Sequence, residues 1–109
     1  MLNQFILVGR LANTKTESNK SIITLAVPRS YKNENGEYDT DFIDIVLYST
    51  IAENTKNYCN KGDLIGITGR VQTTQTEKNK ITEIIGNKVT FLSSHTTTNT
   101  TNDISKGEI

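Results

Sequence analysis

The sequence is poor in the residue types on which many secreted, membrane-spanning and metal-binding proteins depend. Its 109 residues include one cysteine, one histidine, one proline and no tryptophan. A single cysteine, Cys59, cannot form an internal disulfide and fits a reducing compartment, so we expect a cytoplasmic protein. The longest apolar run covers only residues 5–8, which predicts neither a transmembrane helix nor the core of a signal peptide.

The same scarcity argues against catalysis and against a bound cofactor. Cys59 and His95 cannot build a zinc site between them, and Cys59 falls on an apolar helix stripe that favours packing. Asp39, Asp41 and Asp44 do not have the spacing of a calcium loop. The chain contains no P-loop and no glycine-rich dinucleotide fingerprint. We therefore expect no enzyme, no metal and no cofactor.

Charge is balanced, with 12 basic and 12 acidic residues. A basic excess would point directly to nucleic acid, so here the positions of the charges matter more than their sum. The length suits one domain with a modest core. Residues 1–92 carry the apolar pattern, whereas residues 93–109 are rich in Thr and Asn and predict a flexible tail.

The stretch at residues 41–48, DFIDIVLY, is the most informative strand candidate. Alternation places Ile43, Ile45 and Leu47 on a core face and leaves the opposite face with an aromatic ring near each end, Phe42 and Tyr48. At about 3.3 Å per residue the rings are about 20 Å apart, too far to pack on each other. Two spread rings suit a surface that stacks flat groups. Burial against a second layer or another subunit is an equally simple reading, and this strand alone slightly favours it.

Four more strands and one helix follow from the apolar periods. The strand candidates are residues 3–11, 21–28, 64–72 and 80–92, with a polar loop at 12–20 and a phase change near Gly86 that predicts a bulge. Asn35-Gly36 predicts a type I′ hairpin turn. Thr50 and Glu53 match a capping box, and Gly62 suits the end of the helix. Five antiparallel strands closed into a barrel, with one short helix between the third and fourth, make an all-β OB-fold.

Several separate segments resemble the bacterial single-stranded DNA-binding protein family. MLNQFILVGRL at residues 1–11, TLAVPR at 24–29, and DFIDIVLYSTIAENTKNYCNKGDLIGITGRVQT at 41–73 fall in the family's order, followed by ITEII and VTFL. The resemblance covers nearly all of residues 1–92. It implies an OB-fold that forms a homotetramer and wraps single-stranded DNA without sequence preference.

The resemblance also implies which residues contact DNA. Tyr31, Phe42 and Tyr48 match three of the family's four base-stacking positions, while Thr76 replaces the fourth aromatic and Thr74 replaces a usual arginine. Tyr38 matches no stacking position. In the strand pattern, the cations nearest the rings are Arg10, Arg29, Lys32 and Arg70, with Lys78, Lys80 and Lys88 extending the track.

Two further features depart from the family pattern. The loop at residues 12–20 is shorter and lacks the family's aromatic and arginine, and residues 103–109 do not match the acidic tip that docks replication and repair enzymes. Both departures fit a reduced member of phage, plasmid or mobile-element type. Replication or recombination proteins remain candidate partners, without the acidic tip through which the family docks them.

The sequence thus predicts a non-enzymatic protein that coats and protects single-stranded DNA in replication, recombination and repair. It is expected to form a homo-oligomer, a tetramer or alternatively a dimer. One rival is a primosome-type accessory OB protein, which would bridge proteins and bind DNA weakly. The other is a protein-interaction OB domain, in which Phe42 and Tyr48 would be interface residues.

Overall fold

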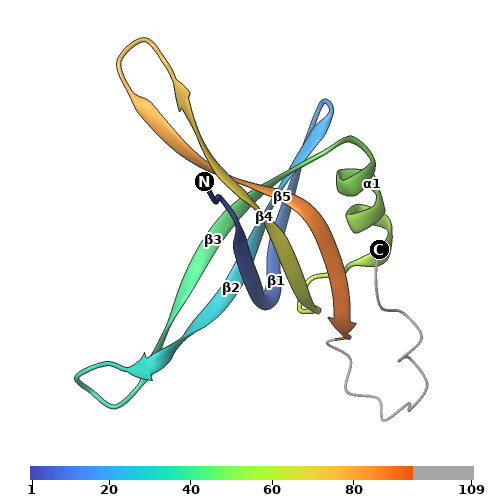
Figure 1. The fold of residues 1–109 in the computed structure, drawn as a ribbon. Helices are drawn as coiled ribbons and strands as arrows, with labels where there is room; N and C mark the ends of the chain where they lie inside the picture. Colours follow the sequence, from blue (N-terminus) through green and yellow to red (C-terminus); the bar gives the residue numbers. More distant parts are fainter. Residues whose placement is uncertain (95–109) are drawn as a thin grey trace.

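A computed structural model describes residues 1–94, so most of the expected tail at residues 93–109 lies outside the described part. The elements follow in the order β1 (Phe5–Glu17), β2 (Lys20–Lys32), β3 (Tyr38–Tyr48), α1 (Ser49–Tyr58), β4 (Leu64–Gln75) and β5 (Lys80–Ser93). The strands close into one barrel in the order β1-β2-β3-β5-β4, with α1 against one end (Figure 1). This confirms the predicted OB-fold. The neighbouring strands pair antiparallel except at the β3–β5 closure, which is a short parallel contact between Val46 and Ile85.

The core forms because the inward faces of the strands carry branched apolar side chains at every second position. The largest fully buried side chains are Ile23, Leu25, Ile45, Leu47, Ile65, Ile67 and Val89. Burying each one contributes about 1.5–3 kcal/mol before the entropy cost of ordering it. Two valines depart from simple alternation. Val46 lies on the outward face of β3 that alternation leaves exposed, but it is buried because β5 covers it at the closure. Val71 is in phase with the buried Ile65 and Ile67, but it is exposed because β4 has by then left the barrel.

The predicted loop at residues 12–20 is wrong, because β1 continues through it and turns tightly at Ser18 and Asn19. Its polar residues pair across to β2 from Asn13 opposite Thr24 to Glu17 opposite Lys20. Threonine suits a strand whose side chains remain half exposed, so a polar run can still be β-structure. A register shift at Ala12 lets β1 bend from β4 to β2.

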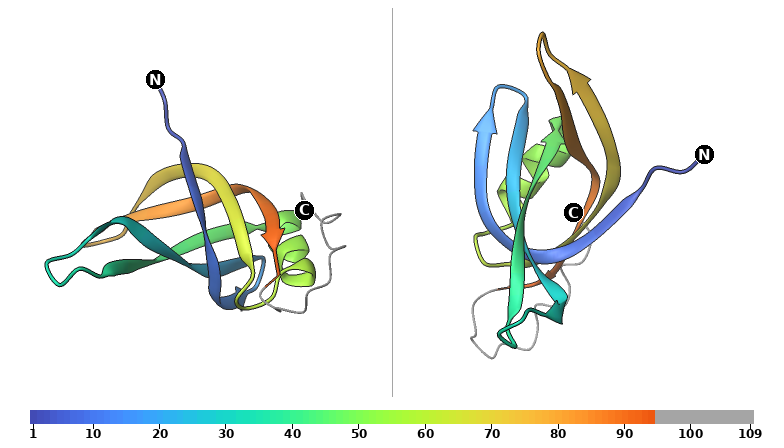
Figure 2. Two further views of the ribbon diagram at one scale, coloured as in Figure 1. Left: turned by 90° about the horizontal axis from the view of Figure 1, so that it is seen from below. Right: turned by 90° about the vertical axis from the view of Figure 1, so that its left-hand side faces the viewer.

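Two hairpins extend beyond the barrel, one formed by β2 and β3 and the other by β4 and β5 (Figures 1 and 2). We call residues 27–41 the β2–β3 arm and residues 70–85 the β4–β5 arm. In Figure 1 both arms project to the side away from α1. β1 pairs with β2 only as far as Ala26, so Pro28 lies where β2 has β3 as its one partner strand. A proline has no N–H to donate to a second strand, which suits this edge position.

The turn of the β2–β3 arm is not the predicted type I′ turn. Gly36 alone has a positive φ, of 80°, and its N–H donates to the carbonyl of Asn33 at 3.0 Å. The Asn33 side chain accepts from the N–H groups of Asn35 and Glu37 at 2.8 and 3.0 Å. An asparagine that accepts from the backbone beyond it stabilises a longer turn, which leaves a single left-handed position for glycine.

The helix is confirmed, but its predicted capping box is wrong. Tyr48 occupies the N-cap position without a side-chain cap, so Thr50 already lies inside the first turn. Cys59 is buried, as its position on the apolar stripe predicts, together with Ala52 and Thr55, whereas Tyr58 is exposed. Gly62, with φ of 96°, serves the turn after the helix, where its N–H donates to the Leu11 carbonyl at 2.7 Å. The predicted bulge near Gly86 is confirmed, because the β4–β5 register shifts there and leaves Asn87 without a cross-strand partner.

Candidate nucleic-acid interface

The outward face of β3 carries both rings that alternation singled out. Phe42 is 67 % exposed, and Tyr48 is partly covered but still 39 % exposed. Between them Val46 is buried in a row with Ile22 of β2 and Ile85 of β5. Asp44 is also exposed on this face between the rings, and its Oδ1 accepts from Thr24 Oγ1 at 2.7 Å. The rings therefore stand near the two ends of an outward face that carries one carboxylate and one buried valine.

Phe42 belongs to a row that runs across three strands. It lies opposite Ala26 of β2, and Ala26 lies opposite Arg10 of β1. Strands are about 4.8 Å apart, so the Arg10 backbone is about 10 Å from that of Phe42 on the same face. The small Ala26 side chain leaves the ring uncovered on that side. The Arg10 Nη1 donates to the Gly62 carbonyl at 3.1 Å, which holds the guanidinium near the β1 end of the row.

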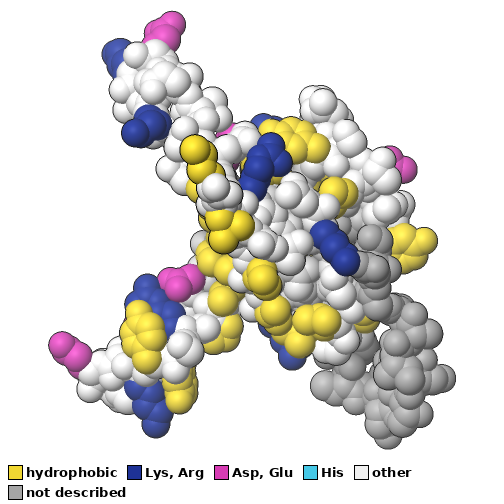
Figure 3. Space-filling model, viewed as in Figure 1, with side chains coloured by type: hydrophobic (Ala, Val, Ile, Leu, Met, Phe, Trp, Pro, Cys, Tyr) yellow, Lys and Arg dark blue, Asp and Glu magenta, His cyan; other side chains and the backbone are white. Residues whose placement is uncertain are grey.

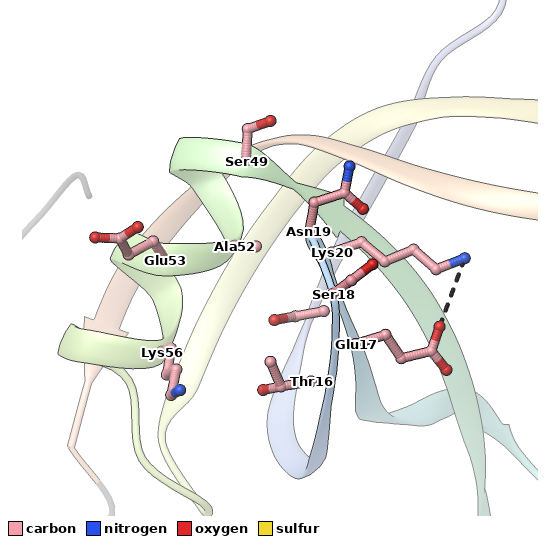
Figure 4. Close-up of a pocket in the computed structure, with 10 residues that line it drawn as sticks. Thr16, Glu17, Ser18, Asn19, Lys20, Ser49, Ala52, Glu53 and Lys56 are labelled. Carbon is pink, nitrogen blue, oxygen red and sulfur yellow. Dashed lines mark ion pairs between the residues drawn. The ribbon is translucent and has the colours of Figure 1, made fainter.

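Tyr48 is accompanied by a cation that sequence reasoning missed. Lys20 lies directly opposite Tyr48 on β2, and its Nζ is 3.8 Å from Glu17 Oε1 (Figure 4). The polar pattern of residues 12–20 predicts a loop, and a loop gives Lys20 no strand face. The runs of threonine and lysine at alternating positions in that segment were the available signal.

A cavity of about 310 Å³ lies between the β1–β2 turn and α1. Its charged lining consists of Glu17, Lys20, Glu53 and Lys56, two of each sign, with hydroxyl and amide groups between them (Figure 4). This balance does not select an anion or a cation. Within residues 1–94 no cluster of His, Cys, Asp or Glu could hold a metal ion.

Arg29, predicted to contact phosphate, is paired with carboxylates of the neighbouring strand. Its Nε donates to both carboxylate oxygens of Asp41 at 3.2 Å, and its Nη2 donates to Asp41 Oδ1 at 2.9 Å. Its Nη1 is 3.8 Å from Asp39 Oδ2. The hydrogen bond and the charge of Asp41 raise the pKa of Arg29, and the hydrogen bond from Arg29 lowers the pKa of Asp41. Arg29 is therefore less available to an incoming phosphate than its sequence position implied.

The rest of the β2–β3 arm presents two tyrosines and one further cation. Tyr31 is 63 % exposed, two residues after Arg29 on β2. Lys32 is paired with Tyr38 across the arm, with its Nζ 5.8 Å from the centre of the Tyr38 ring. The arm as a whole carries two cations, Arg29 and Lys32, against the four carboxylates of Glu34, Glu37, Asp39 and Asp41.

The β4–β5 arm has the opposite charge balance. Arg70, Lys78 and Lys80 are exposed on it, against Glu77 and Glu83. Arg70 donates to Gln72 Oε1 at 2.9 Å and to Asn87 Oδ1 at 3.4 Å, contacts that hold it without neutralising its charge. Hydrogen bonds from Thr74 and Gln72, with the charge of Lys20, lower the pKa of Glu83. The predicted cations of this arm are thus available to an anionic ligand.

Thr76, which stands where the resemblance would place a fourth aromatic, is hydrogen-bonded within the tip of the β4–β5 arm. Thr76 Oγ1 donates to the Asn79 carbonyl at 2.9 Å and accepts from the Asn79 N–H at 3.2 Å. Thr74 Oγ1 donates to Glu83 Oε1 at 2.8 Å. Both threonines hold the hairpin and offer no flat surface. Exposed aromatic rings on the strands of the described residues are instead found on β2 and β3, at Tyr31, Tyr38, Phe42 and Tyr48.

The α-helical part of residues 1–94 is too short and too polar to cross a membrane. The family model of the single-strand binding protein family matches residues 2–92. The single-stranded DNA-binding protein of Streptococcus mutans is 41 % identical over 108 residues, which cover 89 % of this chain and 66 % of that protein. Single-stranded DNA-binding protein B of Bacillus subtilis is 39 % identical over 103 residues, 84 % of this chain and 91 % of its own length.

Solved structures agree with the sequence relatives. The Plasmodium falciparum SSB in complex with ssDNA superposes with a TM-score of 0.67 at 25 % identity, covering 85 % of this chain and 96 % of that one. The wild-type single-stranded DNA binding protein of Thermus aquaticus gives a TM-score of 0.71 at 23 % identity, over 84 % of this chain and 50 % of that chain, and shows a shared fold. The match over residues 2–92, the identity to curated relatives and the closed barrel together show that the chain belongs to the single-strand binding protein family.

Proposed function

We propose that this protein binds single-stranded DNA without sequence preference and coats it during replication, recombination and repair, as a cytoplasmic protein with no catalytic activity. The observation that carries the proposal is the row Arg10–Ala26–Phe42, which sets an exposed ring and a cation on one face with a small residue between them. Every base has a face that can stack on a ring, and each stacking contact contributes about 1–3 kcal/mol. Rings at intervals with cations between them therefore bind any sequence.

Residues 1–92 are proposed as the DNA-binding domain. Phe42 and Tyr48 supply stacking on β3, and Tyr31 supplies it on the β2–β3 arm. Arg10, Lys32, Arg70, Lys78 and Lys80 supply phosphate contacts, with a smaller part for Arg29, which is already paired with Asp41. The basic β4–β5 arm then attracts the strand, and the rings of β3 hold its bases.

The proposal includes self-association through the barrel face that β1 and β4 cross. Ile6 and Val8 of β1 and Leu92 of β5 are exposed, and Val8 and Leu92 both approach the bare Gly66. Figure 3 shows hydrophobic side chains gathered on this face between the two arms. An apolar patch of this kind on a strand face suits a second copy of the same chain. We propose a homo-oligomer, a tetramer or alternatively a dimer.

A titration with poly-dT tests the function. Because the chain has no tryptophan, tyrosine emission reports directly on Tyr31, Tyr38, Tyr48 and Tyr58. We expect quenching on addition of poly-dT, weaker binding as salt rises because phosphate neutralisation releases counterions, and much weaker binding of duplex DNA. Phe42→Ala should weaken binding by about 1–3 kcal/mol, whereas Tyr58→Ala, on the outer side of α1, should not.

The same titration separates the rivals. Weak binding that Phe42→Ala leaves unchanged would favour the primosome-type accessory protein. No binding at low salt would favour the protein-interaction domain and would reject the proposed function.

A further inference from the structure

We infer that Tyr38, with Lys32 held beside its ring, is an additional base-stacking position on the β2–β3 arm. This inference rests on the proposed function and names a contact that the family resemblance does not assign. Tyr38 is 57 % exposed, and the Lys32 ammonium lies over its ring.

The face of Tyr38 follows from strand geometry. Successive side chains alternate along a strand, so Tyr38, Phe42 and Tyr48 all lie on the outward face of β3. Lys32, Ala26 and Lys20 are their respective partners on β2, and the β2–β3 register shifts between Pro28 and Lys32, where β2 carries the extra residues while β3 runs on. Tyr38 is about 13 Å from Phe42 along the strand, and Phe42 is about 20 Å from Tyr48. The three rings therefore form one line on a single strand, with a cation beside each end ring.

Lys32 prepares the Tyr38 ring for a nucleotide. Its ammonium lies 5.8 Å from the ring centre, within the range of a cation–π contact. A lysine over one side of the ring leaves the other side for a base and places positive charge where the phosphate next to that base would lie. Lys32 is also the one cation of residues 27–41 without a carboxylate partner, since Arg29 is paired with Asp41 and Asp39.

The β4–β5 arm offers no stacking surface, which gives the exposed rings of the β2–β3 arm a larger share of base stacking. Thr76 and Thr74 hold the β4–β5 hairpin and cannot stack a base. That arm keeps cations at Lys78 and Lys80 and has no aromatic side chain among residues 70–85. Phosphate attraction and base stacking are thus divided between the arms, and Tyr38 extends the stacking arm by one position.

Fluorescence anisotropy with end-labelled dT oligonucleotides of about 6 and about 16 nucleotides, the span of OB-fold site sizes, tests this assignment. Tyr38→Leu keeps an apolar side chain on the strand but removes the ring. We expect it to weaken binding of the longer oligonucleotide by about fivefold or more, and of the shorter one by less, since Phe42 and Tyr48 remain. Tyr38→Phe should bind like the unmodified protein. Tyr58→Leu, with a 60 % exposed tyrosine on α1, is the matched control and should have no effect.

A second measurement separates stacking from a merely structural role at the hairpin. Oligo-dT carrying iodinated deoxyuridine is irradiated with the unmodified full chain, and the adducts are mapped by mass spectrometry. An adduct at Tyr38 supports the inference. Adducts at Phe42 or Tyr48 without one at Tyr38, or equal affinities of Tyr38→Leu and Tyr58→Leu, would overturn it while leaving the proposed function intact. Failure of the unmodified protein to bind either oligonucleotide would instead reject the proposed function itself.

Discussion

Arg29 and Asp41 face each other across the β2–β3 arm and share three close N–O contacts, of 2.9, 3.2 and 3.2 Å. Asp39 adds a fourth approach to the same guanidinium at 3.8 Å. A side chain whose sequence position suggests phosphate binding is thus already satisfied by its own strand pair. An incoming phosphate must therefore compete with these carboxylates for Arg29.

Asp41→Asn should strengthen DNA binding severalfold. The substitution removes a negative charge from the arm and frees Arg29 for phosphate. On single-stranded DNA each added phosphate contact steepens the slope of log affinity against log salt by about 0.7. Binding titrations at several salt concentrations measure both effects. Glu53→Gln on α1 removes the same charge far from the arm and should leave the slope unchanged. An unaltered slope in Asp41→Asn would mean that Arg29 stays away from the phosphates.

The pH dependence of the pair has a definite sign. The Asp41 pKa is lowered chiefly by the hydrogen bond from Arg29, so the pairing stabilises the arm at pH above the unfolded-state pKa. That contribution is lost as the pH falls through the lower, folded-state pKa. Arg29→Gln should raise the Asp41 pKa toward its ordinary value. Carboxyl carbon shifts followed by NMR during an acid titration measure this, and identical titration curves in both proteins would contradict the pairing.

Gly69→Ala should destabilise the barrel by about 1–3 kcal/mol or more. A Cβ at this position would overlap the carbonyl oxygen of Ile85 and lie 2.8 Å from the Phe5 ring. Gly66→Ala, three residues earlier on the same strand, is the matched control, because its nearest neighbours would be 3.7 Å away. Urea unfolding midpoints compare the two. Equal midpoints would show that β5 can move away from β4 at low cost.

Val8→Lys should dissociate the proposed oligomer. The substitution places a charge in the middle of the apolar face made by Ile6, Val8 and Leu92, and a buried unpaired charge is strongly unfavourable. Sedimentation velocity or light scattering gives the mass directly. Lys56→Met on α1 controls for a surface change elsewhere. An unchanged mass in Val8→Lys would place the contact between copies on a different face.

Burial could be predicted from the sequence where it depends only on the alternation of residues within one strand. Ile45 and Leu47 are buried and Phe42 and Tyr48 exposed, as alternation indicates. Val46 could not be placed, because its burial depends on Ile85, which the closing of the barrel brings to it from far along the chain. The pairing of Arg29 was hidden for a similar reason: it depends on the register of β2 on β3 and on the direction of two long side chains.

Two other predictions were wrong because a local sequence pattern was overridden by the neighbouring strands. Thr50 and Glu53 have the spacing of a capping box, but β3 leads so directly into α1 that Tyr48 becomes the cap position. Residues 12–17 are polar enough for a loop and become strand because β2 offers them partners. The proposed stacking role of Tyr38 could not be predicted from the sequence either, because only the β2–β3 register brings Lys32 beside its ring.

The parallel contact of Val46 with Ile85 has a consequence for how the protein opens. Every other seam of the barrel is a long antiparallel ladder, whereas this one rests on a single residue pair. Thermal fluctuation should therefore part β3 from β5 first, leaving β1–β2–β3 and β4–β5 as two sheets hinged along the β1–β4 ladder. On the proposed path, a DNA strand that contacts both the rings of β3 and the cations of the β4–β5 arm crosses the β3–β5 contact. Bound DNA should then hold the two sheets together. Amide exchange near Val46 and Ile85 should accordingly slow when DNA is bound.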